Sequence, residues 1–399
     1  MSATYFVGID LGGRFHQVAV VDEQGRHVRP SFRIGRGRQG IEELLDRVEA
    51  PATSLVVSIE ATANYWSELV GALVRLGCRV YLISPKKGHD LRRFYALHTK
   101  TDVTDADALA RMPLVDPSLC PVWVAPPAVE TLLRLCRLRW KLRCRIADVK
   151  RRLSMFTDMV MPGLDEVMPV RYSQSARVFM RRYLTAPRAR RLGRKRMDAV
   201  LSRAAWGKFS EKKSAQLWQC IENAPELGWQ PEDLLLETHV QLDELEALES
   251  QVVRLDQRIA ELYGEVDPEH RLLAIPGLGE FLAAAITAHI GEIARFPNAK
   301  HLVSYAGLDP RVHHTAGHSA PGQRISKHGS SFLRAWAYLG ATNARRHDES
   351  LKRYYDRLRS RHKHPNVALC ATAARLLERV YDVMSERRGE HPISASAAT

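Results

Sequence analysis

Residues 4–11 read Thr-Tyr-Phe-Val-Gly-Ile-Asp-Leu, and residues 55–60 read Leu-Val-Val-Ser-Ile-Glu. Both are short, mostly apolar runs rich in β-branched residues, which is typical of buried strands. The first run carries Asp10 near its end, and the second ends on Glu60. If these strands are neighbours, the sequence predicts a sheet on which the two acids lie close together.

The segments around these runs complete an α/β pattern. Further strands are expected at 15–22 and around 26–33, so that the chain opens with an antiparallel three-stranded meander. Helical segments at 39–48 and 65–76 and a strand at 78–83 follow in alternation with the second acidic strand. We therefore expect an α/β layer architecture with a mixed sheet.

Asp102 and Asp105 follow this sheet and are three residues apart, so that on a helix they share one face. Together with the strand acids they would make four carboxylates, which repel one another unless they hold hard cations, here Mg²⁺ or Mn²⁺. Two such ions can catalyse phosphodiester chemistry. Each acid also has a structural alternative, as a cap of a turn or helix or as a first-turn acid favoured by the helix dipole.

Positive charge is concentrated in the middle of the chain. The 399 residues have a formal net charge of +14, and residues 134–203 contain 20 Lys or Arg against 5 Asp or Glu. A block of this kind is typical of a nucleic-acid contact surface, although a solvated helix face can have the same composition. Within it, Arg143, Arg151 and Arg152 are candidate nucleic-acid contacts.

Several features bound the class of protein. No apolar run is long enough to span a membrane, and the N-terminus shows no signal peptide. The six cysteines form no Cys-x-x-Cys pair. These features favour a cytoplasmic protein with reduced cysteines, and they argue against a zinc site or a disulfide framework.

The second half of the chain is mostly helical in pattern. Apolar residues at 245, 248, 252, 255, 259 and 262 are spaced 3-4-3-4-3, which predicts either a coiled-coil hairpin or dimer contact, or a single amphipathic helix. Residues 272–290 resemble a helix-hairpin-helix, whose amides can bind a phosphate. Residues 307–329 form a loop rich in Gly, His and Ser, and helices follow from residue 331.

A set of motifs occurs in a fixed order from one end of the chain to the other. They are Gly8-Ile9-Asp10, Ile59-Glu60-Ala61-Thr62, Lys100-Thr101-Asp102 with Asp105-Ala106, Ile275-Pro276-Gly277-Leu278-Gly279, Ala306-Gly307-Leu308-Asp309-Pro310, and Arg324-Ile325-Ser326-Lys327-His328-Gly329. In this combination the chain resembles the DEDD transposases of the insertion sequence one-ten family, relatives of the pilin-inverting recombinase Piv.

The resemblance implies a domain organisation and an activity. It implies an RuvC-like domain of RNase H fold over 1–158, a basic helical and coiled-coil region over 159–265, and a mostly helical transposase domain over 266–399. Such proteins are RNA-guided recombinases, in which a structured bridge RNA pairs with both target and donor DNA. The implied assembly is a homotetramer, a dimer of dimers, with no membrane partner.

The resemblance also assigns roles to particular residues. It implies that Asp10, Glu60, Asp102 and Asp105 are the catalytic acids and hold Mg²⁺ or Mn²⁺. The family's nucleophilic serine precedes a glycine in the loop after the Gly-Leu-x-Pro motif, and Ala316 occupies that place here.

We interpret Ala316 as an inactivating substitution at the serine position, with Thr315 or Ser319 as the alternative nucleophile in a shifted loop. Arg311, Arg324 and Lys327 flank this position and are candidate contacts to DNA phosphates.

The leading hypothesis is therefore a DNA recombinase that cleaves and rejoins strands through a serine ester. The alternative is a metal-dependent nuclease of the Holliday-junction resolvase type, in which the same acids act with water as the nucleophile. A non-enzymatic hypothesis is that the protein is a scaffold that binds nucleic acid and that the four acids have only structural roles.

Overall fold

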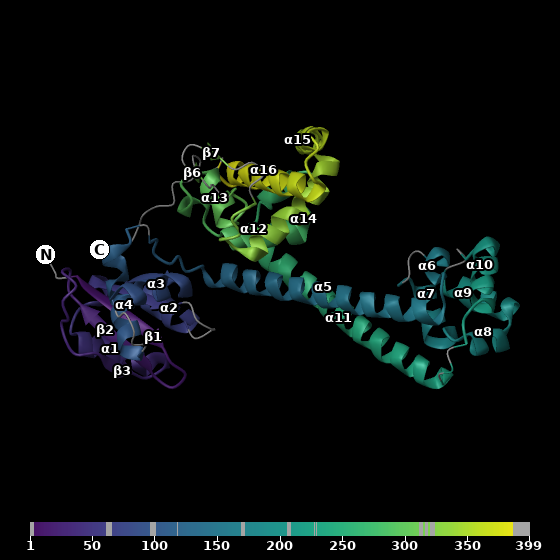
Figure 1. The fold of residues 1–399 in the computed structure, drawn as a ribbon, viewed down its shortest axis with the longest axis horizontal. Coiled ribbons are helices and arrows are strands. Elements are labelled where there is room, and N and C mark those ends of the chain that lie inside the picture. The colour runs from purple at the N-terminus through teal and green to yellow at the C-terminus, as the bar shows by residue number, and fades with distance from the viewer. Residues whose placement is uncertain are drawn as a thin grey trace. The chain divides into compact units, whose positions relative to one another are not determined.

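The computed structural model describes residues 4–60, 66–95, 101–117, 119–168, 172–205, 209–226, 228, 230–310, 314–315, 318–319 and 324–385. The chain divides into two compact units, Met1–Ala125 and Pro126–Thr399 (Figure 1). The first is an α/β unit and the second is mostly helical.

The first unit contains a five-stranded mixed sheet in the order β3-β2-β1-β4-β5. Its strands are β1 (Tyr5–Leu11), β2 (His16–Val21), β3 (Phe32–Ile34), β4 (Leu55–Glu60) and β5 (Arg79–Ile83). The first three pair antiparallel, and β4 pairs parallel with both β1 and β5. The expected meander and mixed sheet are confirmed.

One boundary differs from the sequence expectation. The third strand begins at Phe32 and not near 26, because the Asp22 carboxylate accepts hydrogen bonds from the backbone N–H groups of Gln24 and Arg26 and closes a turn there. Between this turn and Phe32, His27 makes an isolated β-bridge to Val21 and no strand forms. The side chain of Asp22 therefore uses up backbone donors that a strand would have needed.

The two faces of the sheet pack against different helices. On one face, Val7, Ile9, Val57 and Ile59 are completely buried, with α1 (Gly37–Val48) and α2 (Trp66–Arg75) packed against them. The opposite face packs against α4 (Asp102–Val115), with α3 (Pro85–Tyr95) beside it. A short 3-10 helix, Ala52–Ser54, leads into β4.

Gly8 sets how closely α4 approaches the sheet. A methyl group at this position would overlap the carbonyl oxygen of Ala106 and the amide nitrogen of Ala110, both on α4. Ala106 and Ala110 are fully buried against β2 as well. The absence of a side chain at Gly8 and the small side chains on the helix therefore let α4 lie directly on β1.

The second unit is organised around two long helices, α5 (Pro127–Val160) and α11 (Pro231–Val266). Arg139 pairs with Asp256 and Arg152 pairs with Glu244, so residue numbers rise along one helix as they fall along the other. The two helices are therefore antiparallel, and they lie side by side in Figure 1.

Two hydrophobic cores lie along this helical pair. One joins the second half of α5 and the first half of α11 to five shorter helices: α6 (Leu164–Val167), α7 (Gln174–Tyr183), α8 (Ala186–Leu192), α9 (Arg194–Ala204) and α10 (Glu211–Glu222). The apolar seam at 245–262 is buried within the pair and contributes to both cores. The seam thus packs within one chain.

The other core surrounds the completely buried Trp336. It contains α12 (Glu280–Ile290), α13 (Ala299–Tyr305), α14 (Ser331–His347), α15 (Glu349–Ser360) and α16 (Pro365–Ser385), with the 3-10 turns Arg271–Ala274 and Ile293–Arg295. We expected a helix-hairpin-helix over 272–290. The segment before its glycine turn is a short 3-10 helix and not an α-helix, so the first helix of that motif is missing. Gly277 lies against α14, where a Cβ would come within 2.6 Å of Ala344 Cα.

The division at 125/126 differs from the boundary at 158 that we expected. All of α5 packs with α11 and α12, because its apolar face is continuous from Leu132 to Val160 and is buried by those helices. None of the helices in the described part of the chain is both long and apolar enough to cross a membrane.

Candidate active site

The register of the sheet places Asp10 and Glu60 side by side. Ile9 of β1 lies opposite Ile59 of β4, so the next residue on each of these parallel strands is an acid. Side chains alternate along a strand. Because Ile9 and Ile59 face α1 and α2, Asp10 and Glu60 lie on the face that α4 covers.

Polar residues continue this row across the sheet. Gln17 on β2 lies opposite Asp10, and Arg33 on β3 lies opposite Gln17. Arg33 Nε donates to Gln17 Oε1 at 3.3 Å, and Gln17 Nε2 donates to Ser31 Oγ at 2.6 Å. Asp10 is therefore bordered by the Gln17 amide and, beyond it, by the Arg33 guanidinium. Arg33 was not among the predicted site residues.

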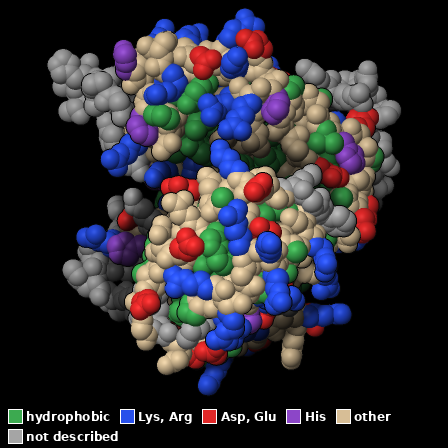
Figure 2. Space-filling model, turned by 90° about the vertical axis from the view of Figure 1, so that its right-hand side faces the viewer, with side chains coloured by type: hydrophobic (Ala, Val, Ile, Leu, Met, Phe, Trp, Pro, Cys, Tyr) green, Lys and Arg blue, Asp and Glu red, His purple; other side chains and the backbone are tan. Residues whose placement is uncertain are grey.

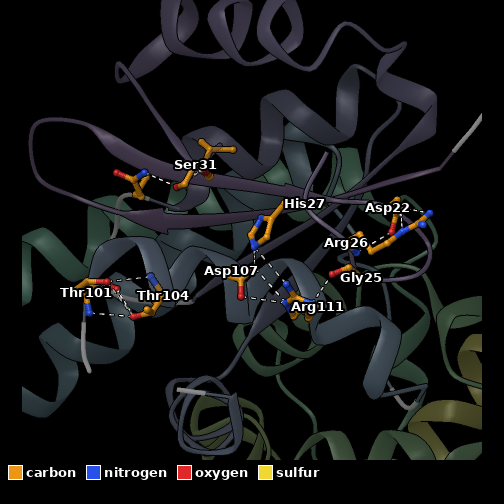
Figure 3. A network of polar contacts seen from close by, with 11 residues as sticks. Asp22, Gly25, Arg26, His27, Ser31, Thr101, Thr104, Asp107 and Arg111 are labelled. Carbon is orange, nitrogen blue, oxygen red and sulfur yellow. Dashed lines mark hydrogen bonds and ion pairs between the residues drawn. The ribbon is translucent and has the colours of Figure 1, made fainter. Parts of the chain in front are cut away.

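The first turn of α4 holds the other two acids. Thr101 is the N-cap, and its side chain accepts a hydrogen bond from the Thr104 backbone N–H at 3.2 Å while Thr104 Oγ1 accepts one from the Thr101 backbone at 3.0 Å (Figure 3). Asp105 is 6% exposed, whereas Asp102 is exposed. This reciprocal capping fixes the turn that presents both carboxylates.

The carboxylate of Glu60 lies against the backbone of α3. A Cβ at Gly88 would be 3.0 Å from Glu60 Oε2, and Gly88 itself is buried. Glu60 is 9% exposed. A glycine in a helix is costly, since it lowers helix stability by up to about 1 kcal/mol. Its presence here leaves room for the Glu60 carboxylate.

Asp107 has a different role from the four acids. It pairs with His27 at 3.1 Å and with Arg111 at 3.1 Å, and Arg111 also donates to the Gly25 carbonyl (Figure 3). These contacts tie α4 to the turn that follows β2. Asp107 therefore serves the packing of α4.

The donor chemistry fits a hard divalent cation. Asp10, Glu60, Asp102 and Asp105 supply only carboxylate oxygens, the ligands that Mg²⁺ and Mn²⁺ prefer. Within the described ranges, however, no three acids, histidines or cysteines are close enough together to form a ready metal site. The topology brings the acids to one edge and one face of the sheet, and coordination would require their side chains to converge.

In the second unit, the segments on either side of the 311–323 loop are joined tightly. Pro310 bridges to Ile325, and the backbone N–H of Lys327 donates to the Gly307 carbonyl at 3.1 Å. A Cβ at Gly329 would lie 2.5 Å from the Gly307 nitrogen. The Arg334 side chain donates to the Ala306 carbonyl at 3.0 Å. The motifs at 306–310 and 324–334 thus form one structural element.

The predicted nucleophile position, residue 316, lies outside the described residues. His314–Thr315 (β6) and His318–Ser319 (β7) pair antiparallel, with Thr315 opposite His318. Ala316 and Arg311 are not among the described residues, and neither are the side chains of Thr315 and Ser319. Arg324 and Lys327, by contrast, are exposed at the base of the loop.

Acids of α11 neutralise part of the basic block. Arg139, Arg152, Arg177, Arg181 and Arg188 each form an ion pair with an Asp or Glu of α11. Each of these ion pairs places a negative charge beside an arginine, which reduces the positive potential that a nucleic acid would meet. Figure 2 shows one face of the structure, on which Asp and Glu side chains lie among those of Lys and Arg.

The three candidate contacts on α5 differ in this respect. Arg152 pairs with Glu244 at 2.8 Å and Arg151 with Asp148 on its own helix, whereas Arg143 is exposed with no ion pair to another described residue. Two aromatic side chains of the block, Phe156 and Phe179, are buried in the hydrophobic core of this region.

Comparison with known proteins identifies the family. Residues 7–162 match a family model described as "Transposase", that of the IS110 DEDD transposases, and residues 269–356 match the model "Transposase IS116/IS110/IS902 family". The chain is 25% identical to a 42 kDa protein of insertion element IS900 from Mycobacterium paratuberculosis, over 100% of both chains.

Two further relatives span most of the chain. A 43.6 kDa protein of insertion element IS110 from Streptomyces coelicolor is 22% identical over 96% of this chain and 94% of its own. The pilin gene-inverting protein of Moraxella bovis is 23% identical over 86% of this chain and 83% of its own. The two family models together cover more than half of the chain and include both acidic strands and the glycine-rich loop base. The chain therefore belongs to the IS110/IS116 transposase family, whose members are enzymes of DNA recombination and transposition.

Proposed function

We propose that Asp10, Glu60, Asp102 and Asp105 form the catalytic site for cleaving DNA strands, with Mg²⁺ or Mn²⁺ as the cofactor. The observation that carries this proposal is the adjacency of Asp10 and Glu60 on parallel strands, on the face covered by the helix that begins at Asp102. The order β3-β2-β1-β4-β5 supports an RuvC-like domain of RNase H fold.

The chain's own residues set up this chemistry. Glu60 and Asp105 are buried, so their charges would act on a substrate with little screening by water. The Thr101–Thr104 capping box holds the first turn of α4, which carries Asp102 and Asp105. When bound, a divalent cation supplies Lewis-acid activation of a phosphodiester.

We further propose that position 316 is the nucleophile position and that alanine there leaves this chain without strand-transfer activity. With serine at 316, the hydroxyl oxygen would attack a DNA phosphorus and form a phosphoserine ester. The bond to one DNA oxygen would break, and that oxygen would take up the proton. The ester would conserve the energy of the broken phosphodiester for rejoining.

The first experiment restores the serine. The Ala316→Ser protein should leave a protein-linked DNA strand on a denaturing gel in the presence of Mg²⁺, and the unchanged chain should not. An Ala316→Ser protein without such a product, beside loss of activity in Ser319→Ala, would overturn the assignment of position 316. Free DNA ends from the unchanged chain would instead favour the resolvase-like nuclease, which needs no serine.

The implied homotetramer would join the acids of one protomer to position 316 of another. Mixing tests this directly, because the unchanged chain has intact acids and an Ala316→Ser/Asp105→Asn protein has the serine only. A shared site predicts the linked product from the mixture and from neither protein alone. An active Ala316→Ser protein with an inactive mixture would show that each protomer uses its own acids.

We also propose that a bridge RNA selects the target and donor DNA. The motif order shared with the family supports this, and the exposed Arg143 is a candidate contact. Purification from a host carrying the flanking DNA, followed by a high-salt wash and RNA sequencing, provides the test. One dominant structured RNA mapping beside the gene is expected, whereas a mixture that washes away as salt rises would contradict RNA guidance.

A further inference from the structure

A groove lies between the base of the 311–323 loop and helix α16. Its volume is about 1000 Å³, at the upper end of the range for ligand sites in proteins. The loop base lines one side, with Pro310 and Ile325, and α16 forms the floor, with Val367, Ala371 and Ala374. It lies wholly within the second unit, and none of the four acids contributes to it.

The floor of the groove is apolar and accessible. Val367 is 55% exposed, and Ala371 and Ala374 are partly exposed. Burial raises the pKa of the Cys370 thiol, so this floor residue stays uncharged at neutral pH. An apolar surface of this kind at the bottom of a groove favours a partner with flat apolar groups.

Cations surround this floor. Arg324 and Lys327 lie on the loop side, and Lys363 and Arg375 on the α15–α16 side. Glu378, which also lines the groove, is already paired with Arg375, and Arg324, Lys327 and Lys363 form no ion pair with another described residue. The net charge of the lining is therefore strongly positive.

We propose that this groove binds an unpaired segment of the DNA strand at the exchange site, with bases on the apolar floor and phosphates on the surrounding cations. An unpaired strand offers both exposed base faces and a line of phosphates, whereas a duplex hides its bases and matches only the cations. The choice of DNA as the strand rests on the proposed function of the adjacent loop.

Two substitutions in the groove test the proposal without touching the acids or position 316. Val367→Asp places a charged carboxylate on the apolar floor where the bases should lie, and α16 tolerates it because an acid in the first turn of a helix is favoured by the dipole. Val253→Asp is the matched control, since Val253 is 58% exposed on α11, far along the sequence from the groove. Lys363→Gln is paired with Lys352→Gln, an exposed lysine of α15 that does not line it.

The measurement is fluorescence anisotropy of a labelled 12-nucleotide single strand, with the unchanged chain and no divalent cation. Binding so measured does not depend on catalysis, so it can fail or succeed independently of the proposed function. Val367→Asp should raise the Kd about tenfold over Val253→Asp. Lys363→Gln should reduce the salt slope of log K by about 0.7, the value for one phosphate of a single strand, and Lys352→Gln should not.

Three results would overturn the proposal. The first is an equal Kd for Val367→Asp and Val253→Asp. The second is an equal loss of affinity for duplex DNA of the same sequence, which would indicate a general phosphate surface. The third is tighter binding of the matching RNA strand with the same loss in Val367→Asp, which would make the groove an RNA site.

Discussion

The contact between Gly88 and Glu60 allows the active-site geometry to be tested separately from folding. In Gly88→Ala, the new methyl group would lie 3.0 Å from Glu60 Oε2 and 3.7 Å from Cδ. Ordinary contact requires the carboxylate oxygen to withdraw by roughly 0.5 Å, since contacts between carbon and other heavy atoms are optimal at about 3.5 Å or more. The obstructing group is the end of a side chain, so the backbone need not move.

Two opposite effects on the protein follow. Replacing glycine by alanine inside α3 favours the helix by up to about 1 kcal/mol, so the free energy of unfolding should stay the same or rise. Ligand distances in a metal site must hold to about 0.2 Å. We therefore expect the affinity for Mn²⁺ in the presence of DNA to fall about tenfold, or about 1.4 kcal/mol.

Thermal unfolding and electron paramagnetic resonance of free Mn²⁺ measure the two effects. Gly71→Ala in α2 is the control, because a Cβ there meets only the end of the Arg75 side chain, at 3.4 Å. Unchanged Mn²⁺ affinity in Gly88→Ala would refute the role of Glu60 as a cation ligand. A fall in melting temperature would refute the description of the contact as one with a movable side chain.

Three further predictions address the packing and electrostatics. Gly8→Ala should lower the free energy of unfolding by about 1–3 kcal/mol or more, because the methyl group meets the backbone of α4; a loss below about 0.5 kcal/mol in urea unfolding would contradict this packing. Burial, with smaller contributions from Arg137 and Arg295, lowers the pKa of His289 to about 3, so the unfolded chain takes up a proton near pH 6.5 that the folded chain does not. Stability should therefore fall between pH 6.5 and 3 by up to about 1.4 kcal/mol per pH unit, and His289→Leu should show a shallower decline in urea titrations over this range. Asp105→Asn should abolish Mn²⁺ binding, whereas Asp107→Asn should keep it and lose about 0.5–1.5 kcal/mol of stability through its contacts with Arg111 and His27; the reverse pattern would exchange the roles of the two acids.

The sheet could be predicted from the sequence because its signals are local. The β-branched runs at 4–11 and 55–60 define strands by themselves, and each carries its acid at the same end. The helix of Asp102 and Asp105 could also be recognised from spacing. The parallel register of Ile9 with Ile59 could not, since it depends on pairing between distant segments.

The charge of the basic block shows where local analysis fails. Counting bases over residues 134–203 leaves out α11, whose acids lie 30 or more residues further along the chain and yet pair with Arg139, Arg152 and Arg177. The room that Gly88 leaves for the Glu60 carboxylate likewise arises only when α3 packs beside β4, so the local sequence does not reveal it. In both cases the decisive contact joins residues that are far apart in the sequence.

The joined base of residues 311–323 has a consequence for substitutions in the helices that support it. Because Pro310 and Ile325 are bridged and Lys327 is hydrogen-bonded to Gly307, the two ends of the loop enter and leave the helical core at one place. A substitution that parts these two contacts would therefore displace both ends of the segment at once. A functional defect that maps to residues 311–323 could thus originate in the helical core at 307–310 or 325–327.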